Sequence, residues 1–153
     1  MLTKKNGDLF ANLTDDNIII PHITNNMNGF GSGFVVPLTN KWPITKELYH
    51  ENKQYQQLGV NQYIDVEKNV VVCHMTAQDN SVLSKSRKVH YGYLAICMED
   101  VATAIQWDRV EENKITEIHT VAFGSGIGGG DADIIDELIE SIWKDIKVTM
   151  WMI

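Results

Sequence analysis

Two glycine-rich stretches dominate this chain: residues 28–33 read Asn-Gly-Phe-Gly-Ser-Gly, and residues 124–130 read Gly-Ser-Gly-Ile-Gly-Gly-Gly. Each follows a short apolar run that is typical of a β-strand, and each precedes a segment whose pattern predicts a helix. Because glycine lacks a Cβ atom, such loops turn sharply and can bring backbone N–H groups close to an anion. Two of them in one small α/β domain predict a site that holds the two phosphates of a diphosphate between them.

The alternative for each loop is a tight connection that only needs unusual backbone dihedrals. Neither loop is a P-loop, because no lysine followed by serine or threonine completes that motif. Neither gives a full dinucleotide-binding GxGxxG fingerprint. Asp131, directly after the second loop, is predicted to cap the following helix, and its carboxylate would repel a phosphate there. The phosphate is therefore expected over residues 125–129 and not at the helix end.

Size and charge narrow the function classes. The 153 residues fit a single domain spanning 1–153, and the formal net charge of −7 argues against a nucleic-acid partner. No apolar run is long enough to cross a membrane, and the N-terminal residues do not resemble a secretory signal. The usage of the two cysteines leads to the expectation of a cytoplasmic location. Cys73 and Cys97 are expected to be buried, reduced thiols, and no spacing predicts a metal site or a cofactor. The oligomeric state is left open.

Hydrophobic patterning predicts alternating strands and helices. Strands are expected at residues 17–24, 60–66, 70–75, 117–123 and 146–152. Helices are expected at residues 34–40, 44–57, 91–106 and 132–143. Residues 67–69 read as a turn that joins two strands into a hairpin, whereas the other strands alternate with helices. This pattern predicts an α/β fold with a mixed central sheet.

Three stretches together resemble the macro domain, the ADP-ribose-binding fold. Gly7-Asp8-Leu9 is similar to the Gly-Asp-Ile motif near the family's N-terminus. Residues 22–33, His-Ile-Thr-Asn-Asn-Met-Asn-Gly-Phe-Gly-Ser-Gly, resemble the first ligand loop, and residues 123–130 resemble the phosphate-wrapping loop. The likeness is closest to yeast-type ADP-ribose 1″-phosphate phosphatases and related phage and bacterial proteins. It implies a three-layer α/β/α sandwich and a small-molecule ligand, ADP-ribose or a derivative.

The resemblance also implies roles for individual residues. Asp8 would accept a hydrogen bond from the adenine amino group; its alternative role is that of a turn residue. Asn25 and Asn28 would lie near the distal ribose; their alternative is turn formation. The glycine loops would supply the remaining ligand-binding residues, namely Gly29, Phe30, Gly31, Ser32 and Gly33 from the first and Ser125, Gly126, Ile127, Gly128 and Gly129 from the second.

The candidate catalytic residue is His22, which matches a histidine of the phosphatase-like branch and could act as a general acid or base. The alternative is a hydrogen-bonded core histidine within an apolar strand. Ala77 and Gly128 stand where some ADP-ribosyl-glutamate hydrolases carry a lysine and an acid, so that chemistry is not expected. Two functions stay open: removal of a phosphate or another group from the 1″ position, or non-catalytic reading or sequestering of an ADP-ribose-type metabolite, for example by a phage anti-defence protein.

Overall fold

Six strands form one mixed sheet in a computed structural model that describes residues 1–81, 87–108, 114–124 and 128–152. The strands are β1 (Leu2–Asn6), β2 (Ile18–Asn25), β3 (Asn61–Glu67), β4 (Val70–Gln78), β5 (Glu117–Val121) and β6 (Lys147–Met152). Their order across the sheet is β1-β6-β5-β2-β4-β3. Only the pairing of β3 with β4 is antiparallel, and the other neighbours are parallel. The predicted hairpin and the mixed sheet are confirmed.

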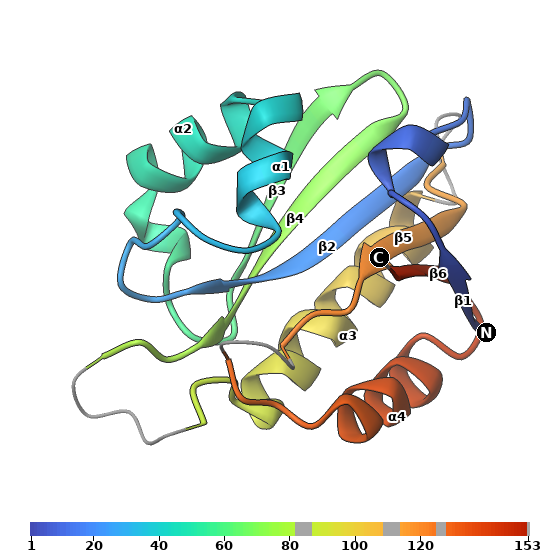
Figure 1. The fold of residues 1–153 in the computed structure, drawn as a ribbon. Helices are drawn as coiled ribbons and strands as arrows, with labels where there is room; N and C mark the ends of the chain where they lie inside the picture. Colours follow the sequence, from blue (N-terminus) through green and yellow to red (C-terminus); the bar gives the residue numbers. More distant parts are fainter. Residues whose placement is uncertain (82–86, 109–113, 125–127, 153) are drawn as a thin grey trace.

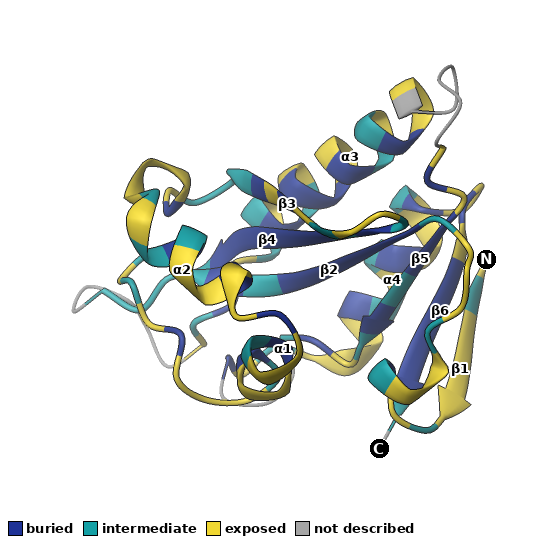
Figure 2. Ribbon diagram, turned by 90° about the horizontal axis from the view of Figure 1, so that it is seen from above, coloured by how far each residue is buried: buried dark blue, intermediate teal, exposed yellow. Residues whose placement is uncertain are grey.

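Helices cover both faces of the sheet (Figure 1). One face carries α1 (Val35–Lys41), α2 (Ile44–Glu51) and a core cluster that includes Ile18 and Ile20. The opposite face carries α3 (Tyr91–Asp108), α4 (Ala132–Ile142) and a cluster that includes Ile19. Alternate residues of β2 therefore point to opposite cores, as the pleat requires. The three-layer α/β/α arrangement predicted from the sequence is confirmed, and Figure 2 shows β2 and β4 buried along most of their length.

The largest differences from the predicted elements are two bounds and one strand that was not predicted. The helix expected over residues 44–57 ends at Glu51, because Asn52 leaves helical geometry at φ −111° and ψ 63°, and a short 3-10 helix, η2 (Lys53–Tyr55), follows. The strand expected over residues 70–75 continues to Gln78. Strand β1 was not predicted, because four of its five residues are exposed and no apolar alternation marks it. It is an edge strand that takes its register from β6, with Leu2 opposite Val148.

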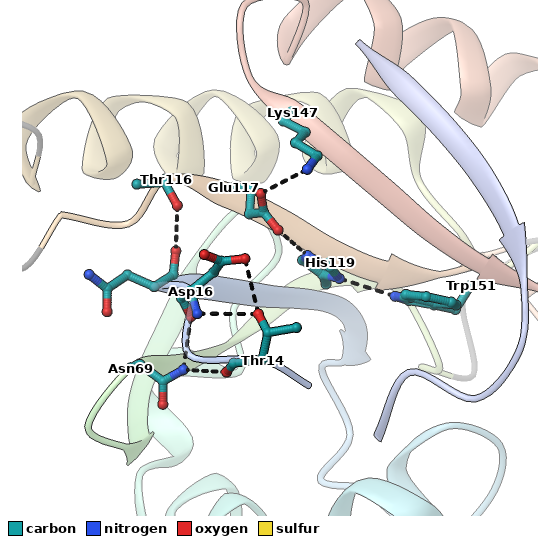
Figure 3. Close-up of polar contacts among 9 residues, drawn as sticks. Thr14, Asp16, Asn69, Thr116, Glu117, His119, Lys147 and Trp151 are labelled. Atoms are coloured by element: carbon teal, nitrogen blue, oxygen red, sulfur yellow. Dashed lines mark hydrogen bonds and ion pairs between the residues drawn. The ribbon is translucent and has the colours of Figure 1, made fainter. Parts of the chain in front are cut away.

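A buried polar chain connects β5 to β6 (Figure 3). Glu117, which is 8% exposed, accepts a hydrogen bond from His119 Nε2 at 2.5 Å and faces Lys147 Nζ at 3.3 Å. The Trp151 indole N–H donates to His119 Nδ1 at 3.1 Å. An indole nitrogen can only donate, so His119 Nδ1 is the acceptor and its Nε2–H points to Glu117. This chain fixes the orientation of a buried carboxylate between two parallel strands.

Replacing Glu117 with glutamine is expected to lower the free energy of unfolding by about 1–2 kcal/mol, because the hydrogen bond from His119 then ends on a neutral amide oxygen and not on a carboxylate. Urea denaturation measures the change. Lys147→Met is the control, since the Lys147 side chain is 68% exposed and such ion pairs contribute at most about 1 kcal/mol. Equal stability of Glu117→Gln and the parent protein would show that the chain contributes nothing.

Candidate ligand-binding site

A cavity of about 330 Å³ opens where β2, β4 and β5 end. These strands are parallel neighbours, so their carboxyl ends meet at one edge of the sheet. Open α/β sheets bind ligands at this edge. The described residues that line the cavity come from three segments, namely residues 22–35, residues 78–80 and residues 121–128. Both glycine loops therefore contribute to one shared cavity.

Most of the predicted site residues of the first loop, including the candidate catalytic residue, line this cavity. They are His22, Asn25, Gly29, Phe30, Gly31, Ser32 and Gly33. A Cβ placed on Gly31 would meet no atom within 4 Å, so the cavity lies open in front of this residue. Gly33 has φ +76°, a value that favours glycine. The backbone of this loop is thus accessible at Gly31, and at Gly33 it has a conformation that residues other than glycine rarely adopt.

Two asparagine side chains hold the first loop in shape. Asn25 Oδ1 accepts from the backbone N–H of Met27 and of Gly29 at 2.9 and 3.1 Å, and its Nδ2 donates to the Gly29 carbonyl at 2.8 Å. Asn28 has φ +62°, and its Oδ1 accepts from Gln56 Nε2 at 2.8 Å and contacts the His50 ring at the same distance. Asn28 does not line the cavity. The Asn25 bonds are those of turn formation, whereas the Asn28 bonds tie the loop to residues that lie more than twenty positions along the chain. Contact with a ribose stays a prediction for both residues.

The second loop is packed far more tightly than the first. A Cβ on Gly128 would lie 2.5 Å from Val89 Cγ2, and one on Gly130 would lie 2.6 Å from the Gly124 carbonyl oxygen. The Gly130 N–H donates to that same oxygen at 2.7 Å. Only glycine fits such close approaches. Gly124 and Gly128 line the cavity, Gly129 does not, and Ser125, Gly126 and Ile127 lie outside the described residues.

Asp131 caps α4, as predicted. Its Oδ1 accepts from the backbone N–H of Asp133 at 2.8 Å and of Ile134 at 3.3 Å. Its own N–H donates to the Tyr91 hydroxyl at 2.7 Å. The carboxylate therefore satisfies the first turn of the helix, which leaves the loop backbone, and not the helix end, for an anion.

His22 is the one titratable side chain among the described residues that line the cavity. It is 2% exposed, and its Nε2 lies 2.6 Å from Nδ1 of His74, a residue of β4 that does not line the cavity. Burial and the neighbouring His74 hold the pKa of His22 well below its ordinary value. Burial lowers the pKa of His74 to about 4. His22 is thus both a hydrogen-bonded core residue and part of the cavity wall, and its catalytic role stays a prediction.

The structure leaves Asp8 outside the cavity wall and adds polar residues that the sequence did not single out. Asp8 is exposed, and its Oδ1 accepts from the Phe10 N–H at 3.0 Å. Gln78 and Asn80 line the cavity from the end of β4, and Thr24 lines it from β2. Thr24 is 4% exposed, yet its Oγ1 has no hydrogen-bond partner among the described residues. Its place two residues after His22, on the same strand face, was the signal that could have found it.

Cysteines and metal-ligating side chains add no further site among the described residues. No group of three or more histidine, cysteine or carboxylate side chains there could hold a metal ion. Cys73 and Cys97 are buried free thiols, and burial raises the pKa of Cys97 to about 12. No helix within the described ranges has the length and apolar character needed to span a membrane.

Comparisons with known proteins agree with this architecture. No family model and no curated protein matches the sequence. A protein of unknown function from Bacteroides thetaiotaomicron has a similar solved structure, with a TM-score of 0.85, 26% identity, and coverage of 99% of this chain and 97% of the other. A macrodomain protein from Streptomyces coelicolor gives a TM-score of 0.82 at 22% identity, over 100% of this chain and 99% of the other. The chain has the macrodomain fold.

Another solved structure with this fold was determined with a ligand. Thermosipho africanus DarTG in complex with ADP-ribose aligns with a TM-score of 0.77 at 12% identity, over 98% of this chain and 41% of that longer one. At this identity the likeness concerns the macrodomain fold. The predicted closeness to the phosphatase-like branch stays a prediction.

Proposed function

We propose that this protein binds ADP-ribose or a close derivative in the cavity between the two glycine loops, and that it removes a phosphate from the 1″ position. The observation that carries the proposal is the convergence of both loops on one cavity at the carboxyl edge of the sheet, with His22 in its wall. The cavity volume of about 330 Å³ lies at the lower end of the range for small-molecule sites. The ADP-ribose complex of the Thermosipho protein, which has the same fold, supports the choice of ligand.

The chemistry of the cavity wall suits a diphosphate held by the main chain. Among the described residues that line the cavity there is no lysine, arginine, aspartate or glutamate. The net charge of −7 gives no long-range attraction for an anion. Backbone N–H groups of the glycine loops would therefore supply the binding, with open space in front of Gly31 and Gly33.

The second candidate is a non-catalytic binder that reads or sequesters an ADP-ribose-type metabolite. One observation favours it: His22 is the only acid–base group that the described part of the cavity wall offers, and its pKa is lowered. The described lining residues include no second acid–base group that could protonate a leaving group. Binding alone needs no such partner.

Calorimetric titration with ADP-ribose and a phosphate-release assay with ADP-ribose 1″-phosphate separate the candidates. For the phosphatase we expect binding and turnover, and we expect His22→Ala to lower turnover by about 10²–10⁴-fold while binding is retained. Binding without phosphate release, even at high protein concentration, would support the binder instead. The absence of both heat and phosphate release would contradict the two candidates together.

A further inference from the structure

His22 and His74 face each other across two neighbouring parallel strands. They are register partners of β2 and β4, and their rings lie edge to face with centroids 4.8 Å apart. The His22 Nε2 to His74 Nδ1 distance of 2.6 Å is that of a hydrogen bond. His74 Nε2 lies 3.0 Å from the backbone carbonyl oxygen of Thr45, a buried residue of α2. A continuous chain therefore runs from α2 through His74 to the cavity wall.

The Thr45 carbonyl oxygen at one end of this chain determines which nitrogen donates in each hydrogen bond. A carbonyl oxygen only accepts, so His74 Nε2 carries a proton and donates to Thr45. In a neutral ring Nδ1 of His74 is then bare and accepts, so the proton between the rings belongs to His22 Nε2. By the same rule His22 Nδ1 is bare. It has no hydrogen-bond partner among the described residues, whereas His22 itself lines the cavity.

We propose that His74 is a positioning residue that holds His22 neutral, with its Nδ1 as a bare acceptor, so that His22 receives a proton-donating group of the ligand or a water molecule and not a phosphate oxygen. The substrate side of this inference rests on the proposed function. It assigns His22 to a base-like role and excludes that of an acid. In this assignment the glycine loops bind the phosphates, and a hydroxyl group or a water molecule lies next to His22 on β2.

The surroundings of the pair favour this neutral state. Aromatic rings enclose His22, with Phe34 at 5.5 Å and Phe30 at 6.3 Å between centroids. Two titratable side chains lie on the α2 side of the pair, namely Tyr49, whose ring lies 5.7 Å from that of His74, and His50, which contacts Tyr49. Burial raises the pKa of Tyr49 to about 12, so its hydroxyl stays protonated at neutral pH.

Thr24 is a second polar residue of the cavity wall, on the same strand face as His22. Its buried Oγ1 lacks a partner among the described residues, although it lines the cavity. A buried hydroxyl without a partner costs free energy, and a ligand group or an ordered water would satisfy it. A hydroxyl can donate and accept, so Thr24 can hydrogen-bond a polar group of the ligand or a water molecule.

Nitrogen-15 NMR of the five histidines at pH 7 tests the assignment directly, with His22 and His74 identified by single substitution. We expect both rings to be neutral with the proton on Nε2, and to stay neutral as the pH falls to 5. A proton on Nδ1 of His22, or a charged His22 ring at pH 7, would overturn the inference. This readout requires neither ligand nor activity.

Two His74 variants distinguish positioning from packing. His74→Leu removes the acceptor, and we expect His22 to show a mixture of both tautomers. His74→Gln retains an acceptor oxygen, and we expect it to restore the single Nε2–H form. Identical His22 spectra in the two variants would contradict the role of His74. His50→Gln is the control and leaves the His22 signals unchanged.

Titration with ADP-ribose then tests the ligand side. We expect the His22 Nδ1 signal to move toward the protonated value as that nitrogen accepts a hydrogen bond. Calorimetric binding without movement of this signal would overturn the assignment of a donor to His22. No binding by calorimetry would overturn the proposed function alone, because the tautomers are measured in the free protein.

Discussion

Replacing Gly31 with glutamate is expected to weaken ADP-ribose binding by about a hundredfold or more while leaving the folded state intact. A Cβ at this position would meet no atom within 4 Å, and the residue is exposed, so the stability change should stay within about 0.5 kcal/mol. A carboxylate about 5 Å from one phosphate charge costs about 3 kcal/mol at an effective dielectric constant of about 20. That energy corresponds to a factor of about a hundred in Kd.

Calorimetric titration of three variants separates charge from size. Gly31→Gln has the same length as glutamate without its charge, and we expect a smaller loss of affinity. Gly31→Lys reverses the charge, and we expect it to bind better than Gly31→Gln. Equal losses with glutamate and glutamine would assign the effect to size. Unchanged affinity in all three would mean that the diphosphate does not lie over the first glycine loop.

Elements with a strong apolar pattern could be predicted from the sequence because one face, or the whole element, is buried along its length. The first five residues of β2 are all buried, and the Ile135 and Ile139 pair of α4 packs into the core below the Asp131 cap. Strand β1 could not be found in this way. Its exposed residues carry no period, and the strand exists because the β6 edge supplies its hydrogen-bond partners.

The glycine loops were visible as a pattern, but their different packing was not. Gly31 faces open space, whereas a Cβ on Gly128 would clash with Val89 of a distant segment and a Cβ on Gly130 would clash with the Gly124 carbonyl of the same loop. A run of glycines gives the same signal in both cases. The contact that requires glycine at position 128 is tertiary, and a local pattern does not contain it.

The pairing of His22 with His74 also lay beyond the sequence. Fifty-two residues separate them, and they meet because the register of β2 against β4 places them opposite each other. A slip of one residue would turn one ring to the other face of the sheet. Thr24 was missed for a related reason: a threonine in a strand is ordinary until a cavity is found beside it.

Replacing Phe30 with alanine is expected to lower the free energy of unfolding by about 3–5 kcal/mol. Phe30 is 6% exposed although it lies in a loop, and its ring packs 4.7 Å from that of Tyr49 and 5.2 Å from that of His74, between centroids. It is the anchor that joins the first glycine loop to the core on the α2 side. A domain of this kind has a total stability of about 5–15 kcal/mol, so the loss is a large fraction.

Urea denaturation of Phe30→Ala and Phe34→Ala measures how much the Phe30 ring contributes to stability. Phe34 also lines the cavity and stacks on Phe10 at 5.7 Å, but it is only half-buried, so Phe34→Ala should cost clearly less. Phe30→Leu should retain most of the stability, because it fills much of the same space. A Phe30→Ala loss no larger than that of Phe34→Ala would show that the loop holds its shape through the hydrogen bonds of Asn25 and Asn28 alone. In that case ADP-ribose affinity would survive the substitution, whereas a true anchor loses stability and affinity together.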